Sequence, residues 1–288
     1  MPMSISAVIP TYNRASMVAK AIESALSQTS PPAEIIVVDD GSSDDTRSVI
    51  ESVSRSNPVR YIWQENRGVA AARNAGIRHA QSEWIAFLDS DDTWVSGHLA
   101  SMASAIEQTE GAAALYFADL IEPTGHRYWE LCEFTIDSEW KLRNDAAEWC
   151  LLPIQPMMLQ ASVLSRRGLE EIGGFPEQMR TREDTLLFFK IGLRYPVCAV
   201  KQCGTIMHAA DSIRLTNVHD SRTTTFNEAT IFMFRDILAM PSLPARYRET
   251  FLKYLSVSHF QMGKVLFNQH KYSAALKQLG LSFVASCK

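Results

Sequence analysis

The sequence predicts an α/β fold with a mostly parallel central sheet and a helical C-terminal appendage. Two observations predict it. Between Ile5 and Leu88, four short apolar runs alternate with three segments whose apolar residues recur at helical spacing. Such alternation is typical of βαβ units, which build parallel strands under helices on both faces. From Thr225 to the end, the pattern is helical throughout.

The four strands of the first half are short and rich in β-branched residues. They are predicted at ISAVIP from Ile5, EIIVV from Glu34, VRYIWQ from Val59 and WIAFL from Trp84. Three helices are predicted between them. The first runs from Arg14 to Gln28 with Asn13 as N-cap, and the second follows Ser42 or Ser43 as N-cap and ends at about Arg55. The third covers GVAAARNAGIRHA.

The second half has less regular patterns. A helix at His98–Gln108 and a strand near Ala112–Ala118 are predicted, whereas Glu122–Leu152 has no assignable period. The glycines of GGF are expected to close a short helix. REDTLLFFKIGLRY then predicts a helix and VCAVKQCGTIMH a strand. After Thr225, amphipathic helices are expected, split near PSLP.

Composition and charge limit the classes of partner and compartment. The net charge of −4 is not that of a typical nucleic-acid-binding protein, so no nucleic-acid partner is expected. The five cysteines form no CxxC pair, which argues against a disulfide framework and a zinc knuckle. The N-terminus does not resemble a signal peptide, and no apolar run approaches the ~20 residues of a membrane span. We expect a cytoplasmic protein, and peripheral contact with the inner face of the membrane stays open.

Polar sequences follow all four strands: PTYN, DDGSSDD, QENRG and DSDD. Because ligands of such sheets lie beyond the C-terminal ends of the strands, these sequences are expected to meet at one site. The aspartates of DSDD, which are Asp89, Asp91 and Asp92, repel one another. A solvated turn is one explanation. We favour a divalent metal ion that joins them to a diphosphate, because Mg²⁺ and Mn²⁺ take carboxylate and phosphate oxygens.

Other residues at these strand ends have the chemistry to bind a nucleotide. Asp40 can accept a hydrogen bond from a base N–H or a ribose hydroxyl, whereas Asp44 and Asp45 suit the N-terminus of a helix. Tyr12 can stack on a base, and packing is the alternative. Arg73 can pair with a phosphate or hold one of the aspartates.

Together, AVIPTYNRA, EIIVVDDGSSDDT, QENRGVAAARNAGI and WIAFLDSDDTW resemble the nucleotide-binding half of family-2 inverting glycosyltransferases, which have the GT-A fold. The resemblance runs from Ala7 to Trp94 and resumes at GGFPEQMRTREDTLLFFKI. It implies transfer of a sugar from a nucleotide diphosphate, with UDP expected first, to an acceptor hydroxyl with inversion. The acceptor would be a saccharide, a lipid-linked saccharide or another hydroxyl compound, in bacterial surface polysaccharide or glycan synthesis.

The resemblance also implies roles for residues of these motifs. Asp91 would be the direct metal ligand, with Mn²⁺ or Mg²⁺ as cofactor, and Asp184 would be the catalytic base. His208 is a second candidate for the metal or phosphates, although Met207 beside it is atypical. For Glu183 and Asp184, the alternative is charge complementarity with a helix N-terminus. The donor would bind to a set of residues at the strand ends and, for Arg73, on the helix that faces the same cleft: Pro10, Thr11, Tyr12, Asp40, Arg73, Asp89 and Ser90.

The same resemblance divides the chain. Residues 1–95 would form the nucleotide-binding half and 96–215 the acceptor-side half of one GT-A domain, followed by a helical region, 216–288. Trp140 and Trp149 lie in the acceptor-side half, where they could bind sugar rings or pack in the core. The helical region could form a homodimer, cover the acceptor cleft or lie on a membrane surface.

Two other functions have to be distinguished from sugar transfer. A nucleotidyltransferase that makes nucleotide sugars would need a glycine-rich basic loop after the first strand, where this chain has PTYNRAS. A non-catalytic module that binds a sugar nucleotide or a protein would not need Asp184. The sequence has no GxGxxG after the first strand and no GxxxxGK[ST], which excludes a dinucleotide-dependent dehydrogenase and a P-loop NTPase.

Overall fold

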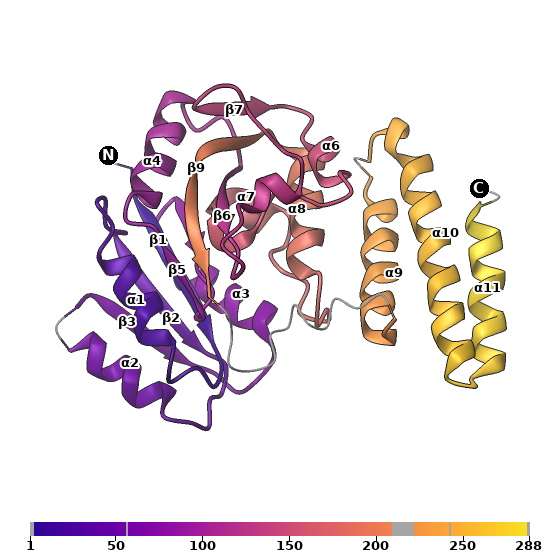
Figure 1. The fold of residues 1–288 in the computed structure, drawn as a ribbon, viewed down its shortest axis with the longest axis horizontal. Coiled ribbons are helices and arrows are strands. Elements are labelled where there is room, and N and C mark those ends of the chain that lie inside the picture. The colour runs from indigo at the N-terminus through magenta and orange to yellow at the C-terminus, as the bar shows by residue number, and fades with distance from the viewer. Residues whose placement is uncertain (1–2, 56, 209–221, 242, 287–288) are drawn as a thin grey trace.

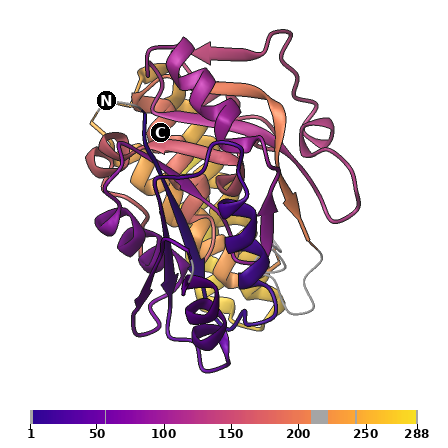
Figure 2. The same cartoon turned by 90° about the vertical axis from the view of Figure 1, so that its left-hand side faces the viewer.

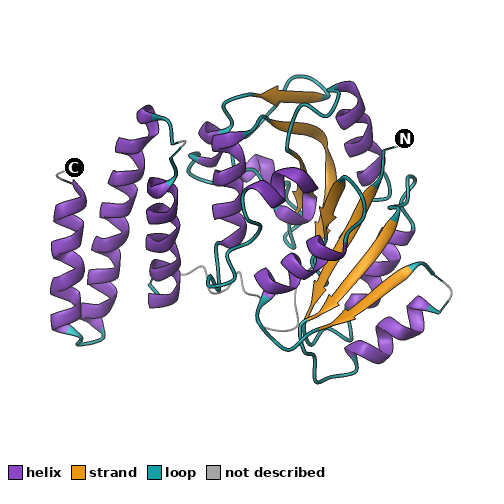
Figure 3. Cartoon of the chain, turned by 180° about the vertical axis from the view of Figure 1, so that it is seen from behind, coloured by secondary structure: helices purple, strands orange, loops and turns teal. Residues whose placement is uncertain are grey.

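The computed structural model describes residues 3–55, 57–208, 222–241 and 243–286. One nine-stranded sheet with helices on both faces forms the larger part, and three helices stand beside it (Figures 1 and 3). In the view turned by 90°, these three helices lie behind the sheet (Figure 2). The predicted α/β fold with a helical C-terminal appendage is confirmed. The expected boundary between residues 215 and 216 lies outside the described residues.

The first half of the sheet is parallel, as predicted. Its strands are β1 (Ile5–Thr11), β2 (Glu34–Asp39), β3 (Val59–Trp63) and β4 (Trp84–Phe87), in the spatial order β3-β2-β1-β4. The connecting helices are α1 (Val18–Leu26), α2 (Thr46–Ser54) and α3 (Val69–His79). Successive residues of β1 face opposite sides of the sheet. Ala7 and Ile9 therefore share a core with α1, whereas Val8 shares one with α3.

The second half of the sheet is mixed, which differs from the expectation of a mostly parallel sheet. Its strands are β5 (Asp92–Trp94), β6 (Leu115–Ile121), β7 (Trp140–Arg143), β8 (Ser162–Ser165) and β9 (Val197–Met207). β6 and β9 run parallel, but β8 pairs antiparallel with β4 and β6, and β9 pairs antiparallel with β5 and β7. β5 and β7 have three and four residues, too few to show a strand period in the sequence.

The helices of the second half are α4 (His98–Gln108), α5 (Tyr128–Leu131), α6 (Ala147–Cys150), α7 (Arg166–Glu171) and α8 (Glu183–Arg194), with a 3₁₀ turn, η1 (Leu159–Ala161). Three of them, α4, α7 and α8, lie where the sequence predicts them, whereas the short α5 and α6 lie in the stretch without an assignable period. The expected closure of α7 by glycine is confirmed, since Gly173 and Gly174 have φ values of 83° and 67°. The backbone N–H of Gly174 donates to the carbonyl of Leu169 at 2.9 Å.

Three helices follow the sheet: α9 (Thr224–Ala239), α10 (Ala245–Asn268) and α11 (Tyr272–Ser286). The rings of Phe189 on α8, Phe234 on α9 and Phe251 on α10 pack against one another and join these helices to the sheet domain. The break between α10 and α11 was not predicted; it includes His270 in the left-handed region at φ 61°. Within the described part of the chain, no helix has the length and apolar character needed to cross a membrane.

The predicted caps of the first two helices are wrong. α1 begins at Val18, and Asn13 lies in a loop with φ 50°, where its Oδ1 accepts from the N–H of Ser43 at 2.8 Å. α2 begins at Thr46, whose N–H donates to Oδ1 of Asp44 at 3.0 Å. The polar residues chosen as caps instead tie the loop after β1 to the loop after β2.

Trp149 and Trp140, whose roles the sequence left open, both contact other side chains of the protein. Trp149 is buried, and its ring packs edge-on against Phe117 and Phe134. Trp140 is half-buried on β7, and its Nε1 donates to Oε1 of Gln108 at 2.6 Å. Trp149 therefore belongs to the core rather than to a sugar-binding surface.

Gly76 on α3 allows this helix to approach β1 closely. A Cβ at this position would lie 2.2 Å from Cγ1 of Val8, which is fully buried. We expect Gly76→Ala to lower the free energy of unfolding by about 1–3 kcal/mol, because the overpacked site cannot relax. Gly280→Ala on α11, where a Cβ meets nothing within 4 Å, should instead raise it by about 0.5–1 kcal/mol. Urea unfolding measures both, and equal effects would contradict the close packing.

Candidate functional site

The C-terminal ends of β1, β2 and β4 lie side by side. Thr11 pairs with Asp39, and the N–H of Asp40 donates to the carbonyl of Thr11 at 2.9 Å. On the other side of β1, Val8 pairs with Phe87, so DSDD emerges beside PTYN. The predicted meeting of the polar strand ends is confirmed, because β1 lies between the two aspartate clusters.

The residues of PTYN differ in exposure. Pro10 is buried within β1. Oγ1 of Thr11 is also buried, and it has no hydrogen-bond partner among the described residues. Tyr12 is 47% exposed at the sheet edge. A buried hydroxyl without a partner is uncommon in folded proteins, and either a water molecule or a ligand atom can supply the missing partner.

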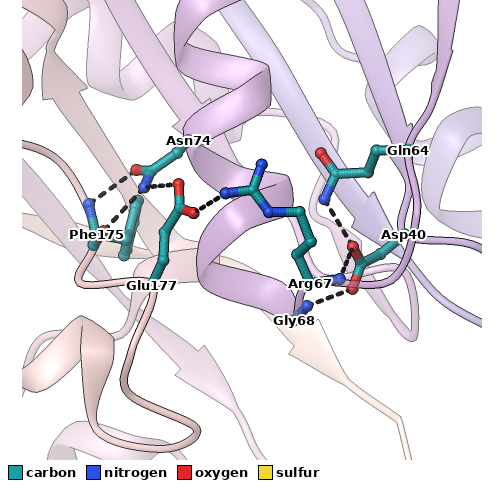
Figure 4. Close-up of polar contacts among 7 residues, drawn as sticks. All are labelled: Asp40, Gln64, Arg67, Gly68, Asn74, Phe175 and Glu177. Atoms are coloured by element: carbon teal, nitrogen blue, oxygen red, sulfur yellow. Dashed lines mark hydrogen bonds and ion pairs between the residues drawn. The ribbon is translucent and has the colours of Figure 1, made fainter.

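Asp40 fixes the loop that precedes α3 (Figure 4). Its side chain is buried and accepts three hydrogen bonds: from Nε2 of Gln64 at 2.7 Å, from the N–H of Arg67 at 2.9 Å and from the N–H of Gly68 at 2.7 Å. An ionised carboxylate has about four acceptor positions, so one remains for a further donor. Asp39 is different, because its two oxygens accept from the N–H of Ser42 and the hydroxyl of Tyr61, which makes it structural.

A second network joins this loop to the GGFPE segment of the second half (Figure 4). Asn74 on α3 accepts from the N–H of Phe175 at 2.9 Å and donates to its carbonyl at 2.8 Å. The guanidinium of Arg67 contacts Glu177 at 2.6 Å. Only glycine fits at position 174, since a Cβ there would lie 2.6 Å from Oδ1 of Asn74. These residues were not predicted as site residues, because their partners lie about a hundred positions away.

Arg73 links the DSDD turn to the start of α8. Its Nη2 donates to Oδ1 of Asp89 at 2.9 Å and its Nη1 to Oε1 of Glu183 at 2.7 Å. The arginine is buried and lies over the ring of Phe175 at 5.4 Å. The sequence predicts that Arg73 pairs with a phosphate or holds an aspartate, and the structure shows the contact with Asp89. The link brings residues from distant parts of the chain together at the edge of the sheet.

The Glu-Asp pair occupies the first turn of α8, as predicted. Burial of Glu183 and the nearby charge of Asp184 raise the pKa of the Glu183 carboxyl to about 6, against the opposite effect of Arg73. Asp184 is half-buried, and its Oδ1 accepts from the N–H of Thr185 at 2.6 Å. Arg182 precedes the pair in the left-handed region at φ 63° and donates to Thr230 of α9 at 3.1 Å. The appended helices thus hold the start of α8.

The DSDD turn has His208 at its side. Asp92 is buried in β5, where it pairs with Met207, and the N–H of His208 donates to its Oδ1 at 3.4 Å. Nε2 of His208 is 2.8 Å from Oγ1 of Thr93. Ser90 is buried in the turn, and Oδ2 of Asp91 lies 3.9 Å from Nη2 of Arg14.

The carboxylates of this turn suit a hard divalent cation better than a soft one. In the part of the chain that the structure describes, no three His, Cys, Asp or Glu side chains form a closed metal cluster. Mg²⁺ and Mn²⁺ commonly take one or two carboxylates and fill the remaining positions with water and phosphate oxygens. Asp91 and Asp89 fit this use, since both retain side-chain exposure, of 15% and 31%.

A cavity of about 530 Å³ lies between α8 and α10. It is bordered by Arg182, Thr185, Phe189 and Tyr254 among others. It therefore adjoins the start of α8 from the side of the appended helices.

Comparison with known proteins gives consistent matches. The family described as Glycosyl transferase family 2 matches residues 6–172. An uncharacterized glycosyltransferase of Nostoc sp. is 32% identical over 178 residues, which cover 57% of this chain and 53% of that protein. The GalNAc(5)-diNAcBac-PP-undecaprenol beta-1,3-glucosyltransferase of Campylobacter jejuni is 36% identical over 125 residues, 42% of this chain and 40% of that protein. The chain thus spans about half the length of these relatives, or less.

Solved structures match over nearly the whole chain. S. aureus TarS 1-349 in complex with UDP-GlcNAc has a TM-score of 0.72 at 17% identity, covering 99% of this chain and 90% of that one. The mannosyltransferase PcManGT of Pyrobaculum calidifontis, in complex with GDP-Man and Mn²⁺, has a TM-score of 0.63 at 19% identity, covering 98% and 75%. At these identities the likeness shows a common fold.

Proposed function

We propose that this chain, which belongs to glycosyl transferase family 2 and has the GT-A fold, transfers a sugar from a nucleotide diphosphate to an acceptor hydroxyl with inversion. The observation that supports this most is the Arg73 link, which joins Asp89 of the DSDD turn to Glu183, the residue before Asp184. Leaving-group stabilisation and proton removal are then available at one edge of the sheet.

The nucleotide would bind at the ends of β1 and β2. Tyr12 would stack on the base, and the remaining acceptor position of Asp40 would take a base N–H or a ribose hydroxyl. The buried hydroxyl of Thr11 would gain the partner that it lacks among the described residues. UDP is the nucleotide we propose first, since TarS, which shares the fold, binds UDP-GlcNAc.

The diphosphate would bind at the DSDD turn, with Asp91 as the direct ligand of Mn²⁺ or Mg²⁺ and with Asp89, Ser90 and His208 beside it. PcManGT, which shares the fold, was solved with Mn²⁺. A bound divalent ion would act as a Lewis acid that stabilises the departing diphosphate. Arg73 holds Asp89 in place, so the turn has a defined shape before the donor arrives.

Asp184 would remove the proton from the acceptor. The acceptor oxygen would attack the anomeric carbon as its bond to the diphosphate oxygen breaks, and the hydroxyl proton would pass to the Asp184 carboxylate. A single displacement of this kind inverts the anomeric centre, in contrast to the two-step route through a glycosyl-enzyme. Glu183 would not compete as a base, because its carboxylate is buried against Arg73.

One relative supports the acceptor class that we propose. The C. jejuni protein is named for an undecaprenol-linked saccharide. We propose a saccharide or lipid-linked saccharide as the acceptor.

The proposal is tested by screening UDP-, GDP- and dTDP-sugars with Mn²⁺ for thermal stabilisation and for release of the nucleotide. Stabilisation is expected for one nucleotide class, together with metal-dependent turnover once an acceptor is added. No stabilisation by any sugar nucleotide would refute the transferase function.

Removal of the metal ligand should weaken donor binding. Asp91→Ala is expected to abolish the part of UDP affinity that depends on Mn²⁺, because the ion would lose its direct protein ligand. Calorimetric titration of UDP with Mn²⁺ and with EDTA measures that part. Asp137→Ala, which removes a carboxylate that is 92% exposed, serves as the control and should behave as wild type. An unchanged Mn²⁺ effect in Asp91→Ala would assign the metal to other residues.

A further inference from the structure

The last two helices differ in charge from the rest of the chain. Residues 245–288 contain seven lysines and arginines and one acidic residue, Glu249. This segment therefore carries a net charge of +6, whereas the whole chain carries −4 and the first 244 residues −10. Such asymmetry between parts of one chain points to an acidic partner for the basic part.

One side of α10 combines these charges with exposed apolar side chains. Residues separated by four, three, four, three and four positions form a single stripe on a helix. The stripe consists of Lys253, Val257, Phe260, Lys264, Phe267 and, just beyond the helix end, Lys271. All six are exposed, and Phe267 retains 59% of its surface. The Lys264 ammonium lies 5.9 Å from the ring centre of Phe260.

α11 presents a second stripe on the same side. Its members are Tyr272, Leu276 and Phe283, with exposures of 51%, 70% and 71%. The contacts between the two helices include Ser256 with Ser282 and His259 with Gln278. In each helix, a residue of the stripe comes directly after an interface residue in the sequence. Phe260 comes after His259, and Phe283 comes after Ser282.

A step of one position is the same rotation of about 100° in both helices. Because α10 and α11 are antiparallel and face each other, this rotation leads to the same side of the pair (Figure 1). The rings of Phe267 and Tyr272, 5.3 Å apart, join the two stripes at the turn. We call the surface formed by the two stripes the hairpin face.

We propose that the hairpin face docks on an anionic lipid surface. Aromatic and aliphatic side chains flanked by lysines are the pattern of helices that lie in the plane of a membrane interface. A second copy is disfavoured as occupant, since a symmetric pair would bring two segments of +6 together. Anionic headgroups would offset that charge while the phenylalanines enter the acyl boundary. The inference is independent of the proposed reaction.

The test uses the full chain and sedimentation with vesicles. We expect binding to vesicles that contain phosphatidylglycerol, little binding to phosphatidylcholine alone, and release at high salt. Lys264→Glu/Lys271→Glu should weaken binding by about 25-fold, at about fivefold per lysine. The matched control, Lys20→Glu/Lys201→Glu, changes two exposed lysines of the sheet domain and should bind as wild type.

A second pair of variants tests the apolar part. Phe260→Ser/Phe283→Ser should change the thermal unfolding temperature little, because the two residues are 47% and 71% exposed, and should lose vesicle binding. Ile154→Ser, at a side chain 45% exposed elsewhere, is the control. Equal binding to both vesicle types, or hairpin variants that bind like their controls, would overturn the proposal. A dimer in light scattering that Phe283→Ser converts to monomer, with no lipid binding, would assign the face to a second copy and also overturn it.

Discussion

Asp184→Asn is expected to bind the donor like the wild type and to lose about 10²- to 10⁴-fold in transfer rate, the usual contribution of a positioned general base. The amide has nearly the shape of the carboxylate and can still accept from the N–H of Thr185. It cannot take the proton of the acceptor hydroxyl. Calorimetry with UDP and an assay of UDP release from the sugar nucleotide separate the two effects.

The control for this experiment is Asp137→Asn, which makes the same chemical change at a carboxylate that is 92% exposed. It should leave both binding and turnover as in wild type. If Asp184→Asn turns over at the wild-type rate, the base is another group, and a non-catalytic binding module becomes the better description. If donor binding is lost as well, Asp184 belongs to the donor site instead.

The first half of the fold was predictable because its signals are local. β1, β2 and β4 are largely apolar runs, whereas β3 includes Arg60, and each of the four is followed by polar residues whose common edge follows from the parallel order. The candidate site residues at that edge, such as Tyr12, Asp40 and Asp91, were chosen for the same reason. Their resemblance to a family then supplied the roles.

The second half and the contacts that fix the site were less predictable because their partners are distant in sequence. β5 has only three residues, and its strand conformation depends on pairing with Thr205–Met207 of β9. Arg73 and Glu183 are 110 positions apart, so no periodicity can reveal the ion pair. Asn13 looked like a helix cap from its neighbours, whereas its real partner is Ser43 in another loop.

Replacement of Arg73 should have the largest effect on stability. We expect Arg73→Met to lower the free energy of unfolding by about 3–5 kcal/mol at neutral pH, the usual cost of removing one partner from a buried ion pair. The methionine leaves Glu183 buried beside Asp184 without its cation, and Asp89 also loses its partner. Urea unfolding gives the difference from the shift in midpoint. Transfer should fall as well, because the DSDD turn and α8 are no longer joined.

The pH dependence of this variant distinguishes loss of an ion pair from loss of packing. A carboxyl whose folded pKa is raised binds more protons in the folded than in the unfolded state, so stability falls as the pH rises through the window between the two values. For Glu183 that window lies between its ordinary value of 4.5 and about 6. Loss of Arg73 removes a group that lowers this pKa, so the window should extend upward. Arg73→Met should therefore regain part of its stability as the pH falls from 7 to about 5.

A matched variant and a double substitution complete this test. Arg67→Met removes an arginine whose side chain is 60% exposed in its pair with Glu177, and it should cost about 0–1 kcal/mol without a pH effect. Glu183→Gln combined with Arg73→Met should lower the free energy of unfolding by less than the sum of the two single changes. In the double variant, neither the Arg73 cation nor the Glu183 carboxylate is left buried without its partner. Additive costs would mean that the two side chains act separately. The link between the DSDD turn and α8 would then be a contact without energetic consequence.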